Sequence, residues 1–284
     1  MALFEVGSRR IDKLGRGKEN INKSVVVAGV GNLGSKIAHN LAKQSFGKII
    51  LIDFDTVEKE NVGYQEYGVQ EIGLPKVEAL KMQLEKTYPW VRVEDHKLYV
   101  VGLGSPVLTD EEILNQDLIL RNLIQNSDCL AVSFDSIWPR LTMLAYSIIY
   151  RKPIVFASAW SNKLSDGILS HHGRLNIWKP GFPCLLCYTF VRSSGAGTYV
   201  AHPTISGMTS NLCSFFVEAI LWDLPVKPYV TIEFSERKNE IKIEHFTGKM
   251  AENCICSKSE ELRKTLEEKG FMELIKILEE AVSR

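Results

Sequence analysis

The sequence has no excess of charge of either sign. Its 34 lysine and arginine residues equal its 34 aspartate and glutamate residues, so the formal net charge of the 284-residue chain is zero. Such a balance provides no overall field that would draw the protein to nucleic acid or to an anionic membrane. We therefore expect neither of these as a partner.

Long apolar runs are also missing. None approaches the roughly 20 residues that a membrane-spanning helix needs, and the N-terminus carries Glu5, Arg9 and Arg10 in place of the apolar core of a signal peptide. We expect a cytoplasmic protein. Cysteine is scarce, with six residues, and in a reducing compartment these are expected to be free thiols or metal ligands before disulfides.

What is present is a glycine motif inside the segment 24–43. A β-branched apolar run over 24–28 predicts a strand buried on both faces. Gly29, Gly31 and Gly34 follow at the G-x-G-x-x-G spacing, and a helical period comes next. The first glycine turns the chain, the second lets the backbone approach a phosphate, and the third packs helix on strand. The helix N-terminus then presents N–H groups to an anion.

Two carboxylates follow predicted strands. The strand over 48–52 ends in Asp53, where an acidic side chain meets ribose hydroxyls. A second buried strand ends in Asp135. Because ligands of open α/β sheets lie beyond the carboxyl ends of strands, we expect both carboxylates to face one crevice. The sequence thus predicts a nucleotide site, although the glycine loop alone would favour a dinucleotide-dependent oxidoreductase.

The remaining pattern predicts an α/β fold in two halves. Residues 1–160 form a Rossmann-like, ATP-binding half with a mainly parallel sheet, and residues 161–284 form an antiparallel half for the substrate or carrier protein, ending in helices. Further strands are expected over 90–93, 154–158, 167–178, 229–234 and 240–245, and helices over 76–88, 110–124, 139–150, 205–221 and, broken at Gly270, 259–284.

Taken together, these motifs resemble the ThiF/MoeB family of adenylyltransferases, which are related to ubiquitin-activating enzymes. The resemblance covers nearly the whole chain. It rests on the glycine loop, the acidic segment 53–61, Gly73-x-Pro-Lys76, Asp135 followed by Arg140, and two cysteine pairs. It implies that the C-terminal carboxylate of a ubiquitin-like or sulfur-carrier protein, or of a peptide, attacks the α-phosphate of ATP, which releases pyrophosphate and leaves an acyl-adenylate.

The resemblance also implies roles for single residues. Lys76 would place a positive charge at the phosphates, Asp135 would hold Mg²⁺, and Asn61 would bind the phosphate region. Two simpler readings stay open: Asp135 as a helix cap and Lys76 as a solvated first-turn residue. The predicted nucleotide-binding residues are Gly29, Gly31, Asn32, Gly34, Asp53, Asp55, Asn61, Gln65 and Lys76.

In the resembled family an arginine from the N-terminal arm of the partner subunit completes the site. Arg9 or Arg10 would fill this catalytic role, which implies a homodimer with shared sites; the alternative is that both are surface charges.

Cys184-x-x-Cys187 and Cys254-x-Cys256 resemble the two halves of a tetrahedral zinc site that clamps the second half. The second pair departs from the family's C-x-x-C spacing: Ser257 occupies the expected ligand position, so Cys256 must reach inward. Cys129 and Cys213 are interpreted as buried small hydrophobic residues.

Two further departures concern the reaction. Tyr64 stands where the family has an arginine, so either another cation substitutes or adenylation is weakened. Thr198 stands where thioester-forming members carry a cysteine, and its hydroxyl is not activated as a thiolate is. We therefore predict adenylation without a thioester on that loop.

Two rival functions remain. An NAD-dependent oxidoreductase would explain Asp53 but leaves Lys76, Asn61 and the cysteine pairs without a role. A catalytically degenerate binding module could hold a partner with the helices over 259–284, but a docked helix pair is the interpretation that we favour for this segment.

Overall fold

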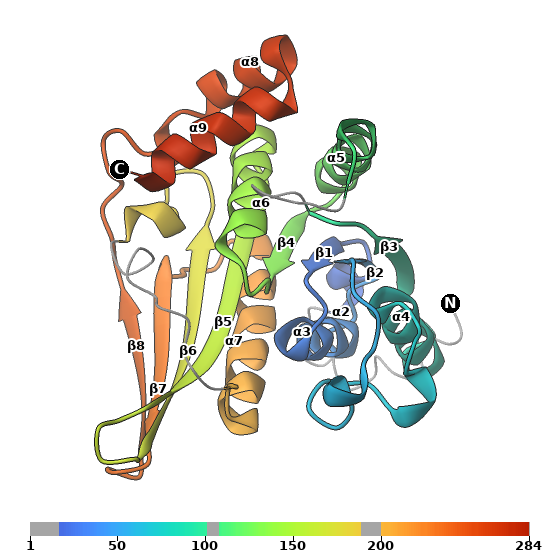
Figure 1. Cartoon of the computed structure of the whole chain (residues 1–284), viewed down its shortest axis with the longest axis vertical. Helices are drawn as coiled ribbons and strands as arrows, with labels where there is room; N and C mark the ends of the chain where they lie inside the picture. The colour runs from blue at the N-terminus through green and yellow to red at the C-terminus, as the bar shows by residue number, and fades with distance from the viewer. Residues whose placement is uncertain (1–16, 101–107, 189–199, 284) are drawn as a thin grey trace.

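A single mixed sheet runs through the molecule. The computed structural model describes residues 17–100, 108–188 and 200–283, and within them eight strands follow the order β3-β2-β1-β4-β5-β6-β7-β8 (Figure 1). The parallel strands are β1 (Ser24–Ala28), β2 (Lys48–Asp53), β3 (Arg92–Lys97), β4 (Cys129–Val132) and β5 (Ile154–Lys163). The antiparallel strands are β6 (Leu169–Trp178), β7 (Tyr229–Ser235) and β8 (Glu240–Phe246). The predicted parallel sheet with an antiparallel continuation is confirmed.

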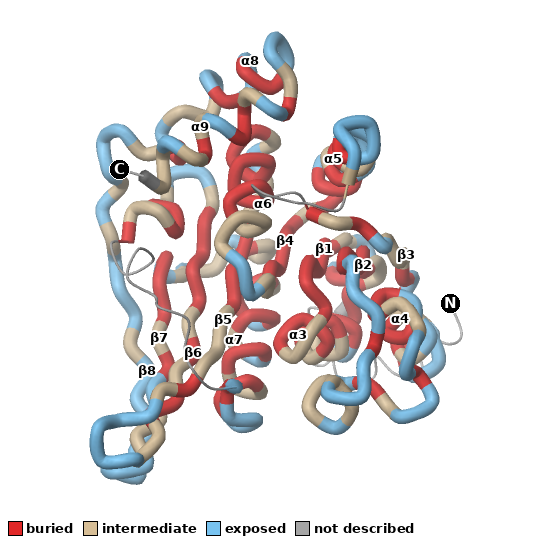
Figure 2. The backbone as a smooth tube through the Cα atoms, viewed as in Figure 1, coloured by how far each residue is buried: buried red, intermediate tan, exposed pale blue. Residues whose placement is uncertain are grey.

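Helices cover both faces of this sheet. One face packs against α3 (Asn32–Lys43), α4 (Lys76–Thr87) and α7 (Pro203–Leu221). The other packs against α5 (Asp110–Gln125), α6 (Ile137–Tyr150), α8 (Ser259–Lys269) and α9 (Phe271–Ser283). A short helix, α2 (Gly17–Asn20), precedes β1. Because side chains of β1 alternate between the two cores, Val26 lies in one and Val27 in the other, and β1 is buried on both faces as expected (Figure 2).

The third strand differs from its prediction. It was expected over 90–93, but β3 begins at Arg92 and continues to Lys97. Polar residues fill this strand because it lies at the edge of the sheet, where only Val93 is buried. The extent of β3 is therefore set by its pairing with β2, in which Ile50 lies opposite Glu94. The pattern of apolar residues does not set it.

The C-terminal helices dock on the molecule. Leu262 of α8 and Leu274 of α9 are fully buried in the same core as α6. The interpretation as a docked helix pair is therefore the right one for their apolar stripes. Among the described helices, none combines the length and apolarity needed to cross a membrane.

The boundary proposed between the halves falls inside β5. This strand extends to Lys163 and pairs along its whole length with β6, so the parallel and antiparallel parts share one sheet.

Candidate active site

The glycine loop connects β1 to α3 and has one open position. Gly29 has a φ of +78°, and a Cβ there would meet the Phe134 ring at 3.0 Å. A Cβ on Gly34 would lie 1.8 Å from the Gly29 carbonyl oxygen, so only glycine lets α3 approach the turn this closely. Gly31 differs, because its nearest neighbour would be Gln65 Oε1 at 4.0 Å. The loop therefore leaves space at Gly31, where a phosphate would approach the backbone.

Asp53 lies at the carboxyl end of β2 beside this loop. The Val30 N–H donates to its Oδ2 at 2.7 Å and the Asp55 N–H to its Oδ1 at 2.9 Å. Burial raises the pKa of Asp53, and these two hydrogen bonds oppose that rise. Each oxygen keeps a further lone pair for a hydroxyl donor, as a ribose-binding carboxylate requires.

Lys76 is a buried cation at the start of α4. It is 7% exposed, and its Nζ lies 2.9 Å from Asp55 Oδ2. Its backbone N–H also donates to the Asp55 carbonyl oxygen at 2.9 Å, which ties α4 to the segment after β2. The alternative of a solvated first-turn lysine is therefore wrong.

Two amides complete this side of the loop. Gln65 Oε1 is buried and has no hydrogen-bond partner among the described residues. Its position facing Gly31 fits a site that receives a donor from a ligand. Asn61 Oδ1 accepts from the Glu58 N–H at 2.9 Å and closes the turn Lys59–Asn61, so its amide oxygen serves the local backbone.

Lys36 is a second cation beside the loop, and the sequence reasoning missed it. Its Nζ lies 2.6 Å from Asn32 Oδ1, 3.2 Å from the Tyr64 carbonyl oxygen and 3.5 Å from Glu66 Oε1. Burial lowers the pKa of Lys36, and Glu66 opposes this effect. The available signal was its place two residues after Gly34, one turn into α3.

Asn32 and Tyr64 connect this corner to α7. The Asn32 amide donates to Ser206 Oγ at 2.9 Å, and the Tyr64 hydroxyl donates to the Ala201 carbonyl oxygen at 2.7 Å. At the position where the family has an arginine, Tyr64 therefore provides an uncharged hydrogen bond to the segment that precedes α7.

Asp135 is exposed beyond the carboxyl end of β4. Its Oδ1 accepts from the Ser136 N–H at 2.7 Å, and Ser136 is the N-cap of α6, so Asp135 does not cap that helix. In the sheet, β1 lies between β2 and β4 (Figure 1). Asp53 and Asp135 therefore lie on either side of the glycine loop, beyond the carboxyl ends of these strands.

Arg140 fixes the backbone next to Asp135. Its Nε donates to the Phe134 carbonyl oxygen at 2.5 Å and its Nη1 to Ser158 Oγ on β5 at 2.7 Å. Burial lowers the pKa of Arg140 to about 10, Asp135 opposes the shift, and the charge of Arg174 adds to it.

The cysteine pairs form one cluster of sulfur atoms. The Sγ atoms of Cys184, Cys187, Cys254 and Cys256 all lie within 4.8 Å of one another. A tetrahedral zinc ion with bonds of about 2.3 Å would hold its sulfurs roughly 3.8 Å apart, so the cluster fits zinc. The Ser257 hydroxyl instead donates to the Cys254 carbonyl oxygen at 2.7 Å.

The two other cysteines are fully buried, as expected. Burial raises the pKa of the Cys129 thiol to about 12 and raises that of Cys213 as well, so both stay protonated.

Arg9, Arg10 and Thr198 lie outside the residues that the structure describes.

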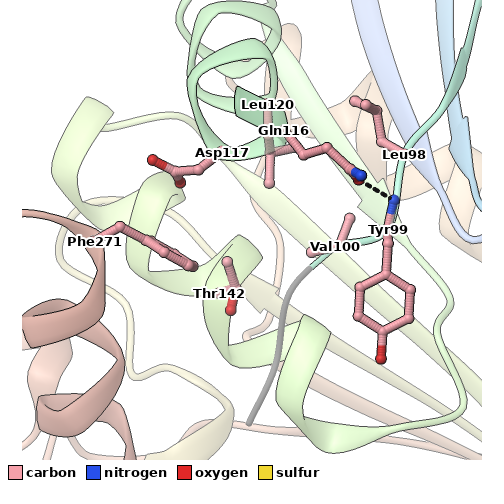
Figure 3. A pocket seen from close by; sticks show the side chains of 8 residues that line it. All are labelled: Leu98, Tyr99, Val100, Gln116, Asp117, Leu120, Thr142 and Phe271. Atoms are coloured by element: carbon pink, nitrogen blue, oxygen red, sulfur yellow. Dashed lines mark hydrogen bonds between the residues drawn. The ribbon is translucent and has the colours of Figure 1, made fainter. Parts of the chain in front are cut away.

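A separate small cavity lies between the end of β3 and helices α5, α6 and α9 (Figure 3). It contains no predicted site residue. Its lining residues are Leu98, Tyr99, Val100, Gln116, Asp117, Leu120, Thr142 and Phe271.

A glycine loop between a parallel strand and a helix, with an acid ending the next strand, defines a Rossmann-like nucleotide-binding protein. The model of the ThiF family matches residues 9–221, and the chain belongs to that family.

Curated relatives match parts of the chain. Ubiquitin-like modifier-activating enzyme 5 of Caenorhabditis briggsae is 39% identical over 84 residues, which are 30% of this chain and 19% of that protein. Adenylyltransferase and sulfurtransferase MOCS3 of Drosophila willistoni is 27% identical over 169 residues, which are 58% of this chain and 32% of that protein. The chain thus spans 19% to 32% of the length of these relatives.

Among solved structures, MccB of E. coli with ATP superposes with a TM-score of 0.64 at 20% identity, covering 85% of this chain and 68% of that one. This similarity supports the fold.

Proposed function

We propose that the chain adenylates the C-terminal carboxylate of a ubiquitin-like sulfur-carrier protein or of a peptide, at the expense of ATP. The observation that carries this proposal is the pair of lysines beside the glycine loop: Lys76 is buried, and Lys36 is partly buried with a side chain that is 18% exposed. Hydride transfer has no need of such charges, whereas a triphosphate under attack by an anion does. The names of the relatives, an activating enzyme and an adenylyltransferase, point the same way.

In this reaction a carboxylate oxygen of the substrate attacks the α-phosphorus of ATP. The bond from that phosphorus to the oxygen bridging to the β-phosphate breaks, and pyrophosphate leaves with the electron pair. Asp53 would bind the ribose, the backbone at Gly31 would approach the phosphates, and Lys76 and Lys36 would offset their charge. Asp135 would hold Mg²⁺, which when bound neutralises charge on phosphate oxygens.

We further propose that zinc in the cysteine cluster has a structural role, that no thioester forms at Thr198, and that the protein works in the cytoplasm, where its thiols stay reduced. A homodimer in which Arg9 or Arg10 enters the partner's site would complete the machinery.

The test is exchange of labelled pyrophosphate into ATP, with and without carrier proteins and peptides that end in Gly-Gly. Exchange should depend on the carrier, and Asp135→Asn should reduce it by about 100-fold or more without changing the melting temperature. The matched control is Asp223→Asn, because that side chain is 98% exposed and follows the C-terminal end of α7.

The outcomes separate the rival functions. Absence of exchange together with tight NAD binding would favour an oxidoreductase. ATP binding without exchange would favour a catalytically degenerate binding module. Full exchange in Asp135→Asn would remove that residue from the proposed magnesium site.

A further inference from the structure

Arg174 of β6 is a half-buried cation clamped between aromatic rings. Its guanidinium carbon lies 4.9 Å from the centre of the Trp160 ring on β5 and 5.7 Å from that of Tyr229 on β7. In cation–π contacts the aromatic rings pack against the flat faces of a guanidinium. The N–H groups at its edge then remain available to an anion that lies in the plane of the guanidinium.

No carboxylate of the described residues forms an ion pair with this cation. In the described part of the chain, Arg92, Arg121, Arg237 and Arg263 each form an ion pair with a carboxylate, but Arg174 and the neighbouring Arg140 form none. The Nε atom of Arg174 is buried and has no hydrogen-bond partner there. A buried donor without a partner costs stability, so this N–H group is suited to a ligand that supplies an acceptor.

Arg174 belongs to the same neighbourhood as Asp135. It pairs across the sheet with Ser158, whose hydroxyl accepts from Arg140 Nη1 at 2.7 Å. Arg140 in turn holds the carbonyl oxygen of Phe134, the residue before Asp135. The charges of Arg174 and Asp135 both act on the pKa of Arg140, in opposite directions, which agrees with this proximity.

The order of the strands separates this cation from the nucleotide residues. Asp53 ends β2 and the glycine loop follows β1, whereas Arg174 lies on β6, beyond β4 and β5 (Figure 1). Lys36 and Lys76 serve the phosphates from α3 and α4. An anion bound at Arg174 therefore approaches Asp135 from the β5–β6 side of the sheet, whereas the glycine loop approaches it from the β1 side.

We propose that Arg174, clamped by Trp160 and Tyr229, binds the C-terminal carboxylate of the acyl substrate and directs it toward Asp135. The proposal rests on the adenylation function proposed above. A carboxylate matches the guanidinium fork with two parallel hydrogen bonds. The site is thus a carboxylate subsite distinct from the phosphate-binding loop.

The experiment follows the Arg174 Nε–H signal of the ¹⁵N-labelled full chain by nuclear magnetic resonance, assigned through its loss in Arg174→Lys. The probes are acetyl-Gly-Gly, its C-terminal amide, and ATP, each titrated separately. The signal should shift saturably with acetyl-Gly-Gly and stay unchanged with the amide. A shift with ATP alone would reassign the site to phosphate, and no shift with either anion would overturn the proposal.

Variants supply the second readout. Arg174→Gln should weaken acetyl-Gly-Gly binding at least ten-fold and ATP binding less than two-fold, and Arg174→Lys should give an intermediate loss because it keeps the charge without the fork. Arg263→Gln is the matched control, since that residue forms only exposed ion pairs on α8. Equal losses in Arg174→Gln and Arg263→Gln would contradict the proposal.

The same titrations keep the two proposals apart. Carboxylate binding at Arg174 by a chain that does not bind ATP would end the adenylation proposal and leave the subsite. ATP binding and pyrophosphate exchange with no response at Arg174 would support adenylation and overturn the proposed carboxylate subsite.

Discussion

At the scale of the residue, Lys36 supplies a charge that Tyr64 cannot. Its ammonium group lies 3.2 Å from the Tyr64 carbonyl oxygen, one turn into α3, and Glu66 is the one carboxylate of the described residues that forms an ion pair with it, at 3.5 Å. A lysine is a compact point charge on a flexible stem, so it can reach a phosphate without the bidentate geometry of an arginine. Of the alternatives left by Tyr64, substitution by another cation is therefore the one that the geometry favours.

This view predicts a loss and a rescue. Lys36→Gln should weaken ATP binding about ten-fold, or roughly 1.4 kcal/mol, and AMP binding much less, because the ammonium acts on the outer phosphates. Adding Tyr64→Arg should restore most of the affinity for ATP. Isothermal titration calorimetry measures both.

Lys43→Gln provides the comparison, since Lys43 is exposed in the last turn of the same helix. An equal loss for AMP, or no recovery with Tyr64→Arg, would show that Lys36 does not bind the outer phosphates.

At the scale of the element, Asp117 links two helices through a buried carboxyl group. The Tyr146 hydroxyl of α6 donates to its Oδ1, and Arg121 Nε lies 2.9 Å from its Oδ2. Burial raises the pKa of Asp117 from 3.8 to about 6, against the attraction of Arg121. The neutral acid is thus the form that the packing of α5 on α6 prefers.

A raised carboxyl pKa contributes stability that is complete below the unfolded value and is lost as pH rises through the folded one. The wild-type free energy of unfolding should therefore fall by up to about 3 kcal/mol, relative to Asp117→Asn, between pH 4 and pH 7. Urea unfolding at several pH values measures this difference. Parallel curves for the two proteins would mean that folding does not raise the pKa of Asp117.

The cysteine cluster connects two distant short turns. Leu185–Cys187 follows β6, and Ile255–Ser257 precedes α8, so a metal between them would join the antiparallel part to the C-terminal helices. Structural zinc sites contribute directly to folding free energy.

Loss of one sulfur should therefore be costly, and loss of the neighbouring hydroxyl should not. Cys256→Ser is expected to release zinc and lower the melting temperature by about 10 °C or more, whereas Ser257→Ala should keep one zinc per chain. Metal analysis and thermal unfolding give the answer. Zinc retained by Cys256→Ser and lost from Ser257→Ala would reverse the proposed ligand set.

At the scale of the whole molecule, shared sites in a homodimer predict complementation. A protein with Arg9→Ala and Arg10→Ala, and a second with Asp135→Asn, should each be inactive in pyrophosphate exchange. Mixed dimers should regain activity, because one of their sites combines intact residues from both chains. Light scattering reports the dimer, and exchange by the mixture reports the shared site. A dimer that never regains activity would place the arginines outside the partner's site.

The fold could be predicted where local sequence carries the signal. The β-branched run before Gly29 and the helical period after Gly34 define a strand and a helix by themselves, and the predicted helix after residue 259 breaks at Gly270 as found. The edge strand β3 could not be placed correctly, because its pairing with β2 decides its extent. Edge strands expose polar side chains that hide the period of a strand.

The candidate site divides in the same way. The sequence by itself determined the glycine loop, the carboxylates Asp53 and Asp135, and the cysteine pairs, because each depends on spacing along a short segment. Only the tertiary structure brought Lys36 to Tyr64 and Arg174 between Trp160 and Tyr229. Contacts between side chains on separate strands or turns depend on how the chain packs, and no local period records them.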